Sequence, residues 1–120
     1  MNTIEFDEHT VGKNQDIKVL LLNGSVDAYN SQMLADKLND IIQEGFYKII
    51  MDCSRLRFIS SSGMGVFLAM EDDLRRHNGG LKFVVVSDII LNVFKKVGLA
   101  DIFKIYYQES LAIEEFNREI

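Results

Sequence analysis

Three consecutive serines, Ser60, Ser61 and Ser62, stand directly before the sequence Gly-Met-Gly near the middle of the chain. A serine hydroxyl can attack a substrate, accept a phosphate, or accept a hydrogen bond from a free amide at a helix start. The serines fall where a strand-like pattern gives way to a helical one. The simplest interpretation is that Ser60 or Ser61 caps a helix that begins near Ser62.

Two glycines in the first turn of this predicted helix, Gly63 and Gly65, indicate a use beyond capping. Each costs up to ~1 kcal/mol relative to alanine inside a helix. We therefore expect another backbone or a partner to approach closely there. Free amides and the positive end of the helix dipole also favour an anion at this position. A phosphate would suit it, whether carried by a ligand or attached to a serine.

A catalytic serine would need a base, usually histidine, within hydrogen-bonding distance. The chain has two histidines, His9 and His77. A helix running from Ser61 to His77 would separate them by about 24 Å at ~1.5 Å per residue, and His9 is expected at an exposed loop or edge position. The hydrolase elbow, the P-loop and metal-ligand clusters are absent from the sequence. We therefore predict no catalytic residue, no metal site and no cofactor.

Length and composition are typical of one folded domain over residues 1–120. The chain is 48% hydrophobic and 26% charged, as in globular proteins. Its net charge of −5 argues against nucleic-acid binding, which depends on Lys and Arg. The sequence shows no signal peptide and no apolar stretch long enough to span a membrane. The single cysteine, Cys53, favours a reducing compartment, so we expect a cytoplasmic protein in which Cys53 is buried and unreactive.

Hydrophobic patterns predict strands that alternate with helices. The strands are expected at residues 3–7, 17–22 (ended by a turn at Asn23-Gly24), 46–51 (closing on Asp52), 81–86 and 102–107. The helices are expected from a cap at Asn30 or Ser31 to Gly45, from the serines to residues 78–80, from a cap at Ser87 to Gly98, and around residues 111–116. This order favours an α/β fold with a mixed, mostly parallel sheet of about four to five strands, covered by about four helices.

The stretch from Ile49 to Met70, IIMDCSRLRFISSSGMGVFLAM, resembles the signature of STAS domains, the family of bacterial anti-sigma factor antagonists. That signature is a strand ending in Asp-hydrophobic-Ser, followed by Asp-Ser-Ser/Thr-Gly-hydrophobic-Gly at a helix start. NGSVDAYN, from Asn23 to Asn30, resembles the family's turn after its second strand, and VFKKVGLADIFKIY resembles its closing segment. The resemblance covers nearly the whole chain, and the predicted element order is the family's order.

The resemblance implies a binding switch and not an enzyme. Unphosphorylated members of the family bind an anti-sigma factor that is also a serine kinase, and so release a sigma factor; a PP2C-type phosphatase reverses the phosphorylation. Carried over to this sequence, the phosphoacceptor is Ser61, with Ser62 and Ser60 as alternatives. The implied partner-binding residues are Asp27, Ser60, Ser62, Gly63 and Met64. Neither nucleic-acid contact nor membrane insertion is implied, and the oligomeric state is left open.

One position departs from the family pattern. The residue before the phosphoserine is usually Asp, and here it is Ser60. Serine can still cap the helix, but the local negative charge is lost, and this affects what a kinase or phosphatase recognises. Two other roles stay open: a non-enzymatic subunit of a transporter or other signalling complex, and a sensor that binds a nucleotide or other small anion at the helix N-terminus.

Overall fold

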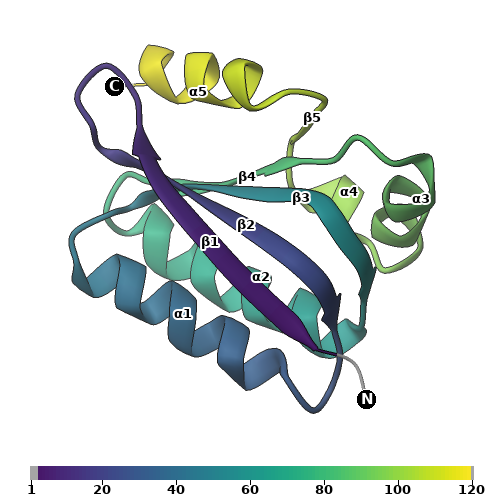
Figure 1. The fold of residues 1–120 in the computed structure, drawn as a ribbon. Helices are drawn as coiled ribbons and strands as arrows, with labels where there is room; N and C mark the ends of the chain where they lie inside the picture. Colours follow the sequence, from purple (N-terminus) through teal and green to yellow (C-terminus); the bar gives the residue numbers. More distant parts are fainter. Residues whose placement is uncertain (1–2, 120) are drawn as a thin grey trace.

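The computed structural model describes residues 3–119, which form a five-stranded sheet with helices on both faces (Figure 1). In chain order the elements are β1 (Ile4–Val11), β2 (Ile17–Val26), α1 (Ser31–Gln43), β3 (Lys48–Ile59), α2 (Ser61–Arg75), β4 (Gly80–Val84), α3 (Asp88–Lys96), α4 (Leu99–Ile102), β5 (Ile105–Tyr106) and α5 (Glu109–Arg118). The strand order is β1-β2-β3-β4-β5, with β1 antiparallel to β2 and the other neighbours parallel. The predicted α/β class and mostly parallel sheet are confirmed.

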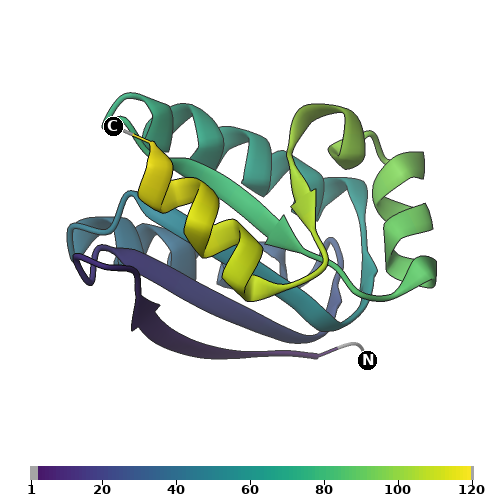
Figure 2. The same ribbon diagram turned by 90° about the horizontal axis from the view of Figure 1, so that it is seen from above.

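The sheet is buried on both faces by apolar side chains. Helices α1 and α2 cover one face, and α5 crosses the other (Figures 1 and 2). Phe83 is central to the larger core, where its ring lies 4.9, 5.6 and 5.0 Å from those of Phe67, Phe94 and Phe103. The smaller core beneath α5 consists of Ile17, Val19, Ile50, Val84, Ala112 and Phe116. This double burial explains why the central strands are continuous apolar runs in the sequence.

The strands β1, β2 and β3 run further than the sequence patterns indicated. The turn predicted at Asn23-Gly24 is wrong, because β2 continues to Val26. Gly24 has φ 122°, and a Cβ there would lie 2.1 Å from the carbonyl oxygen of Thr3; glycine is needed for this close approach and not for a turn. The strand predicted to close on Asp52 likewise continues to Ile59. Register shifts in the β2–β3 ladder accompany both extensions.

The C-terminal third also differs in detail from the prediction. Gly98 has φ 87° and follows α3 as predicted, but a short helix, α4, begins immediately after it. The strand expected at residues 102–107 is therefore reduced to β5. Val86 is 59% exposed because β4 ends at Val84, so the strand predicted at residues 81–86 ends two residues earlier than expected. Within residues 3–119, no helix has the length and apolar character needed to cross a membrane.

Candidate functional site

The segments that follow β2 and β3 meet at the carboxyl-end edge of the sheet. Val26 pairs with Ile59 in the parallel ladder, and the Ser60 amide donates a hydrogen bond of 2.9 Å to the Val26 carbonyl oxygen. The segments that follow β2 and β3 leave the sheet at this point, one toward Asp27 and the other into α2. Asp27 and the three serines therefore lie at the same edge, where parallel α/β sheets commonly bind ligands and partners.

Ser60 is the cap of α2. Its backbone is extended (φ −87°, ψ 171°), and its Oγ accepts a hydrogen bond of 3.4 Å from the Gly63 amide. The helix begins at Ser61, one residue earlier than predicted. Ser61 and Ser62 are exposed, and their hydroxyls make no hydrogen bond within residues 3–119. The structure thus separates one half-buried capping hydroxyl from two hydroxyls that are free to react or to contact a partner.

The N-terminus of α2 favours negative charge. No acidic residue stands in its first turn, and the amides of Ser61 and Ser62 find no acceptor among the described residues. Together with the helix dipole, such amides stabilise a nearby anion by about 0.3–1 kcal/mol at an exposed position. A phosphate on Ser61 would therefore be compatible with the fold.

The two glycines of the first turn have different surroundings. Gly63 is buried, and a Cβ there would lie 2.7 Å from Ile59 Cγ1 and 2.8 Å from Val26 Cγ1. A Cβ on Gly65 would meet nothing within 4 Å. Met64 is half-buried and packs against the core. The close neighbour that the sequence predicted at Gly63 is therefore the domain's own sheet, whereas Gly65 leaves the surface open.

The loop after β2 is held together by its own side chains. Asp27 Oδ1 accepts hydrogen bonds from the amides of Tyr29 (2.9 Å) and Asn30 (3.0 Å). Asn30 Oδ1 accepts one from the Asp27 amide (2.8 Å), and its Nδ2 donates to the Ser25 carbonyl oxygen (2.8 Å). Asn30 is the N-cap residue of α1, one of the two predicted positions, but its side chain makes no cap hydrogen bond. The Asp27 side chain therefore stabilises the loop to which it belongs.

Neither histidine reaches the serines. His9, exposed on edge strand β1 as predicted, lies 3.3 Å from Glu109 through Nε2. Its ladder partner Val19 precedes Val26 by seven residues, which is roughly 23 Å of strand. His77 follows the far end of α2 and stacks on Tyr47, with ring centroids 4.3 Å apart. The described residues include no cluster of three or more His, Cys, Asp or Glu suited to a metal ion.

Cys53 is fully buried in β3, and this burial raises the pKa of its thiol well above the usual value. The raised pKa keeps the thiol protonated at neutral pH, and a protonated, inaccessible thiol is a poor nucleophile. The prediction of a buried cysteine is therefore confirmed.

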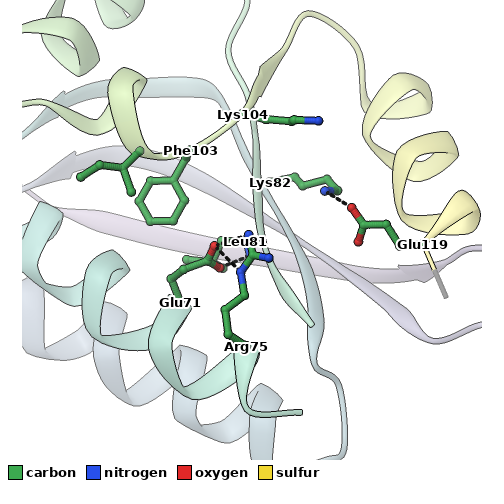
Figure 3. A pocket seen from close by; sticks show the side chains of 8 residues that line it. Glu71, Arg75, Leu81, Lys82, Phe103, Lys104 and Glu119 are labelled. Atoms are coloured by element: carbon green, nitrogen blue, oxygen red, sulfur yellow. Dashed lines mark hydrogen bonds and ion pairs between the residues drawn. The ribbon is translucent and has the colours of Figure 1, made fainter. Parts of the chain in front are cut away.

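A pocket of about 300 Å³ lies away from the serines, beside the first residues of β4, which precede its pairing with β5 at Phe83 (Figure 3). Its charged groups are already paired: Glu71 accepts hydrogen bonds from the Leu81 amide (2.8 Å) and from Arg75 Nε (3.1 Å), and Lys82 Nζ donates to Glu119 (2.8 Å). The Glu71 carboxylate thus accepts the hydrogen bond of a β4 amide that the short strand β5 does not reach. None of the site residues predicted from the sequence lines this pocket.

Sequence reasoning missed three exposed side chains beside the serines. Tyr29 is 95% exposed and Phe58 is 45% exposed, and Arg57 is also exposed. The β2–β3 register steps from Leu56 to Phe58, so Arg57 has no ladder partner and β3 bulges there. The sequence could have identified Tyr29, because an aromatic residue within a turn motif is a sign of an exposed side chain that contacts a partner. Strand alternation could not reveal two successive exposed residues, because the bulge is set by pairing with β2.

Comparison with known proteins supports the resemblance found in the sequence. The model of the STAS domain family matches residues 9–112. The anti-sigma-B factor antagonist of Bacillus subtilis is 25% identical over 95 residues, covering 79% of this chain and 86% of that protein. The structure of the anti-sigma factor antagonist SpoIIAA in its unphosphorylated form is similar with a TM-score of 0.76 at 25% identity, covering 97% and 99% of the two chains. The structure of the Bacillus cell fate determinant SpoIIAA in its phosphorylated form is similar with a TM-score of 0.67 at 26% identity, covering 93% of this chain and 99% of that one.

Proposed function

The chain belongs to the STAS domain family, and on that premise we propose that it is an anti-sigma factor antagonist switched by phosphorylation of Ser61. The observation that carries the proposal is the exposed, unbonded Ser61 hydroxyl at the N-terminus of α2. Proteins named anti-sigma factor antagonists, and a solved phosphorylated form of one similar protein, support it. The proposed unit is one STAS domain over residues 1–120.

In the unphosphorylated state, the protein binds an anti-sigma factor that is also a serine kinase, and a sigma factor is released. The proposed contact surface surrounds Ser61 and includes Asp27, Ser60, Ser62 and Met64. Gly63, implied with them by the sequence, is buried against the sheet and supports this surface from within. The contact surface is a binding surface without catalytic residues, cofactor or metal. Because the proposed partners act on transcription, the proposed location is the cytoplasm.

Phosphorylation acts on the interface and spares the fold. A phosphate adds about −1.5 to −2 charges at pH 7, and the α2 N-terminus tolerates that charge. In an interface built around a neutral hydroxyl, an unpaired charge costs several kcal/mol. A loss of about 4 kcal/mol is roughly a thousandfold in affinity, enough to exchange partners. A PP2C-type phosphatase then restores the binding state.

Ser61 is preferred over its neighbours for a structural reason as well as the family pattern. The Ser60 hydroxyl accepts the Gly63 amide and is half-buried, so modifying it would disturb the cap. Ser62 is exposed like Ser61 and is the natural comparison in any test. Ser60 keeps the capping function of the Asp that is usual at this position.

The deciding experiment combines the purified chain with the anti-sigma factor kinase of the same organism and ATP, followed by mass spectrometry. We expect one phosphate on Ser61, none on Ser61→Ala, and unchanged phosphorylation of Ser62→Ala. By calorimetry, Ser61→Asp should bind the same anti-sigma factor at least tenfold more weakly than wild type. Phosphate on another residue overturns the site assignment. Equal binding by Ser61→Asp would instead indicate a constitutive subunit, and no binding by wild type overturns the function.

A further inference from the structure

Tyr29, Arg57 and Phe58 are exposed residues near the ends of β2 and β3, the strands that lead to Asp27 and Ser61; together they are here called the anchor surface. Tyr29 is 95% exposed and Phe58 is 45% exposed. Phe58 pairs with Ser25 in the ladder, and the next pair is Val26 with Ile59. The anchor surface and Ser61 therefore project from the ends of the same two strands. One partner that covers Ser61 has the anchor surface within its reach.

The loop holds Tyr29 in an outward position. The Asp27 carboxylate accepts a hydrogen bond from the Tyr29 amide. The Asn30 side chain bonds both the Asp27 amide and the Ser25 carbonyl oxygen of β2. These bonds fix the backbone on both sides of Tyr29 without using its side chain. A preorganised aromatic loses little conformational freedom on binding, and tyrosine is enriched among the residues that dominate binding energy. The exposed Tyr29 side chain on this hydrogen-bonded loop is thus well placed to bind a partner protein.

Arg57 supplies a positive charge that the domain itself leaves uncompensated. Some exposed cations have carboxylate partners: Arg76 bonds Asp72 and Asp73, and Lys104 bonds Glu115. Others, such as Arg55 and Lys13, have no ion pair within residues 3–119. Arg57 has no ion pair or hydrogen bond within residues 3–119, although the chain carries an excess of acidic groups. The bulge in β3 turns Arg57 and Phe58 outward together. A cation next to exposed aromatic rings fits an apolar recess with an acidic rim.

We propose that the anchor surface determines which anti-sigma factor this protein recognises. Tyr29 and Phe58 enter an apolar recess of that partner, and Arg57 faces one of its carboxylates. The inference rests on the proposed function, because it takes the occupant to be the anti-sigma factor. The anchor surface is then a second contact region, separate from the proposed phosphorylation site. Ser61 controls whether binding occurs, and the anchor surface controls with whom.

Calorimetry with the anti-sigma factor kinase of the same organism tests this with matched variants. Tyr29→Ala should weaken binding at least tenfold, equal to about 1.4 kcal/mol, while Tyr29→Phe stays within threefold of wild type. The control Tyr107→Ala removes another exposed tyrosine, which is 72% exposed and next to β5, a strand separated from β2 by both β3 and β4. This variant should bind like wild type. Unfolding midpoints should be unchanged in all three variants, since these side chains are largely exposed.

A charge pair of variants tests the second part. Arg57→Glu should weaken binding at least tenfold, and the loss should be smaller at high salt. Lys13→Glu makes the same change in net charge at the β1–β2 turn, at the other end of the sheet, and should bind like wild type. An equal loss for both variants would indicate general charge repulsion and would overturn the role of Arg57.

The outcomes distinguish this inference from the proposed function. If Ser61→Asp loses binding while Tyr29→Ala and Arg57→Glu bind like wild type, the anchor surface is overturned and the switch stands. If wild type does not bind the anti-sigma factor, both proposals fail. Sedimentation of the chain alone provides the remaining comparison. A dimer that Tyr29→Ala dissociates, with binding to the anti-sigma factor unaffected, would assign the surface to a second copy and overturn the inference.

Discussion

Gly63 lies so close to Val26 that a Cβ added to the glycine would stand 2.8 Å from Val26 Cγ1. Ile59 lies equally close on the neighbouring strand, with its Cγ1 2.7 Å from the same position. The first turn of α2 is therefore seated directly on the ends of β2 and β3. This contact sets the height of Ser61 above the sheet edge and its placement next to the loop that carries Tyr29.

Gly63→Ala should destabilise the fold by about 1–3 kcal/mol, because a methyl group would overpack a buried contact. Alanine is the better helix former by up to ~1 kcal/mol, and this gain offsets only part of the loss. Gly65→Ala is the matched control, since a Cβ there meets nothing within 4 Å; it should be neutral or more stable by up to ~1 kcal/mol. Urea denaturation of both variants gives the comparison. Equal stability of the two would contradict the contact.

The sequence predicted the kinds and order of the main elements because each carries a clear period. Helical spacing of apolar residues located α1, α2 and α3, and continuous apolar runs located the central strands. The extents of β2 and β3 were not predictable, because Gly24 and the bulge at Arg57 depend on pairing between strands. A local reading takes Asn23-Gly24 for a turn, whereas β1 and β3 hold it in the sheet.

The candidate site was predictable in part for the same reason. The Ser60 cap is a local interaction, and it was among the alternatives drawn from sequence alone. The actions of Asn30 and Asp27 depend on a mutual loop geometry that the residue types do not specify. A close approach at Gly63 was expected from its cost in a helix, but only the packing identifies the sheet as its neighbour.

Placing a negative charge on Ser61 should leave the fold intact. Ser61→Asp should be as stable as wild type or more stable by up to about 1 kcal/mol at low ionic strength, because the carboxylate interacts favourably with the helix N-terminus. Ser61→Lys should be less stable by a similar amount, and salt should reduce both effects. Thermal unfolding at two salt concentrations measures them. A marked loss of stability in Ser61→Asp would argue against a phosphate being tolerated at this position.

Glu8 joins edge strand β1 to helix α1 through an ion pair with Lys37. The close ion pair with Lys37 lowers the pKa of Glu8, and the charge of Lys18 adds to this against the opposing effect of partial burial. The folded-state pKa is thus below the unfolded one. Ionised Glu8 therefore stabilises the fold above the unfolded pKa, and this contribution is lost as pH falls through the folded pKa.

Glu8→Gln should accordingly be less stable than wild type at pH 7, by up to about 1 kcal/mol because the pair is partly solvated. The difference should shrink as pH falls below about 4.5, near the ordinary pKa of a glutamate, and vanish once Glu8 is protonated in the folded state as well. Glu5→Gln is the control on the same strand, since Glu5 is exposed and has no ion pair within residues 3–119; its stability should follow wild type. Urea midpoints across pH 3–7 measure all three proteins. If Glu8→Gln were less stable than wild type by the same amount at every pH in this range, the substitution would act through packing. Protonation of Glu8 removes its charge and leaves its packing unchanged, so only a charge effect can depend on pH.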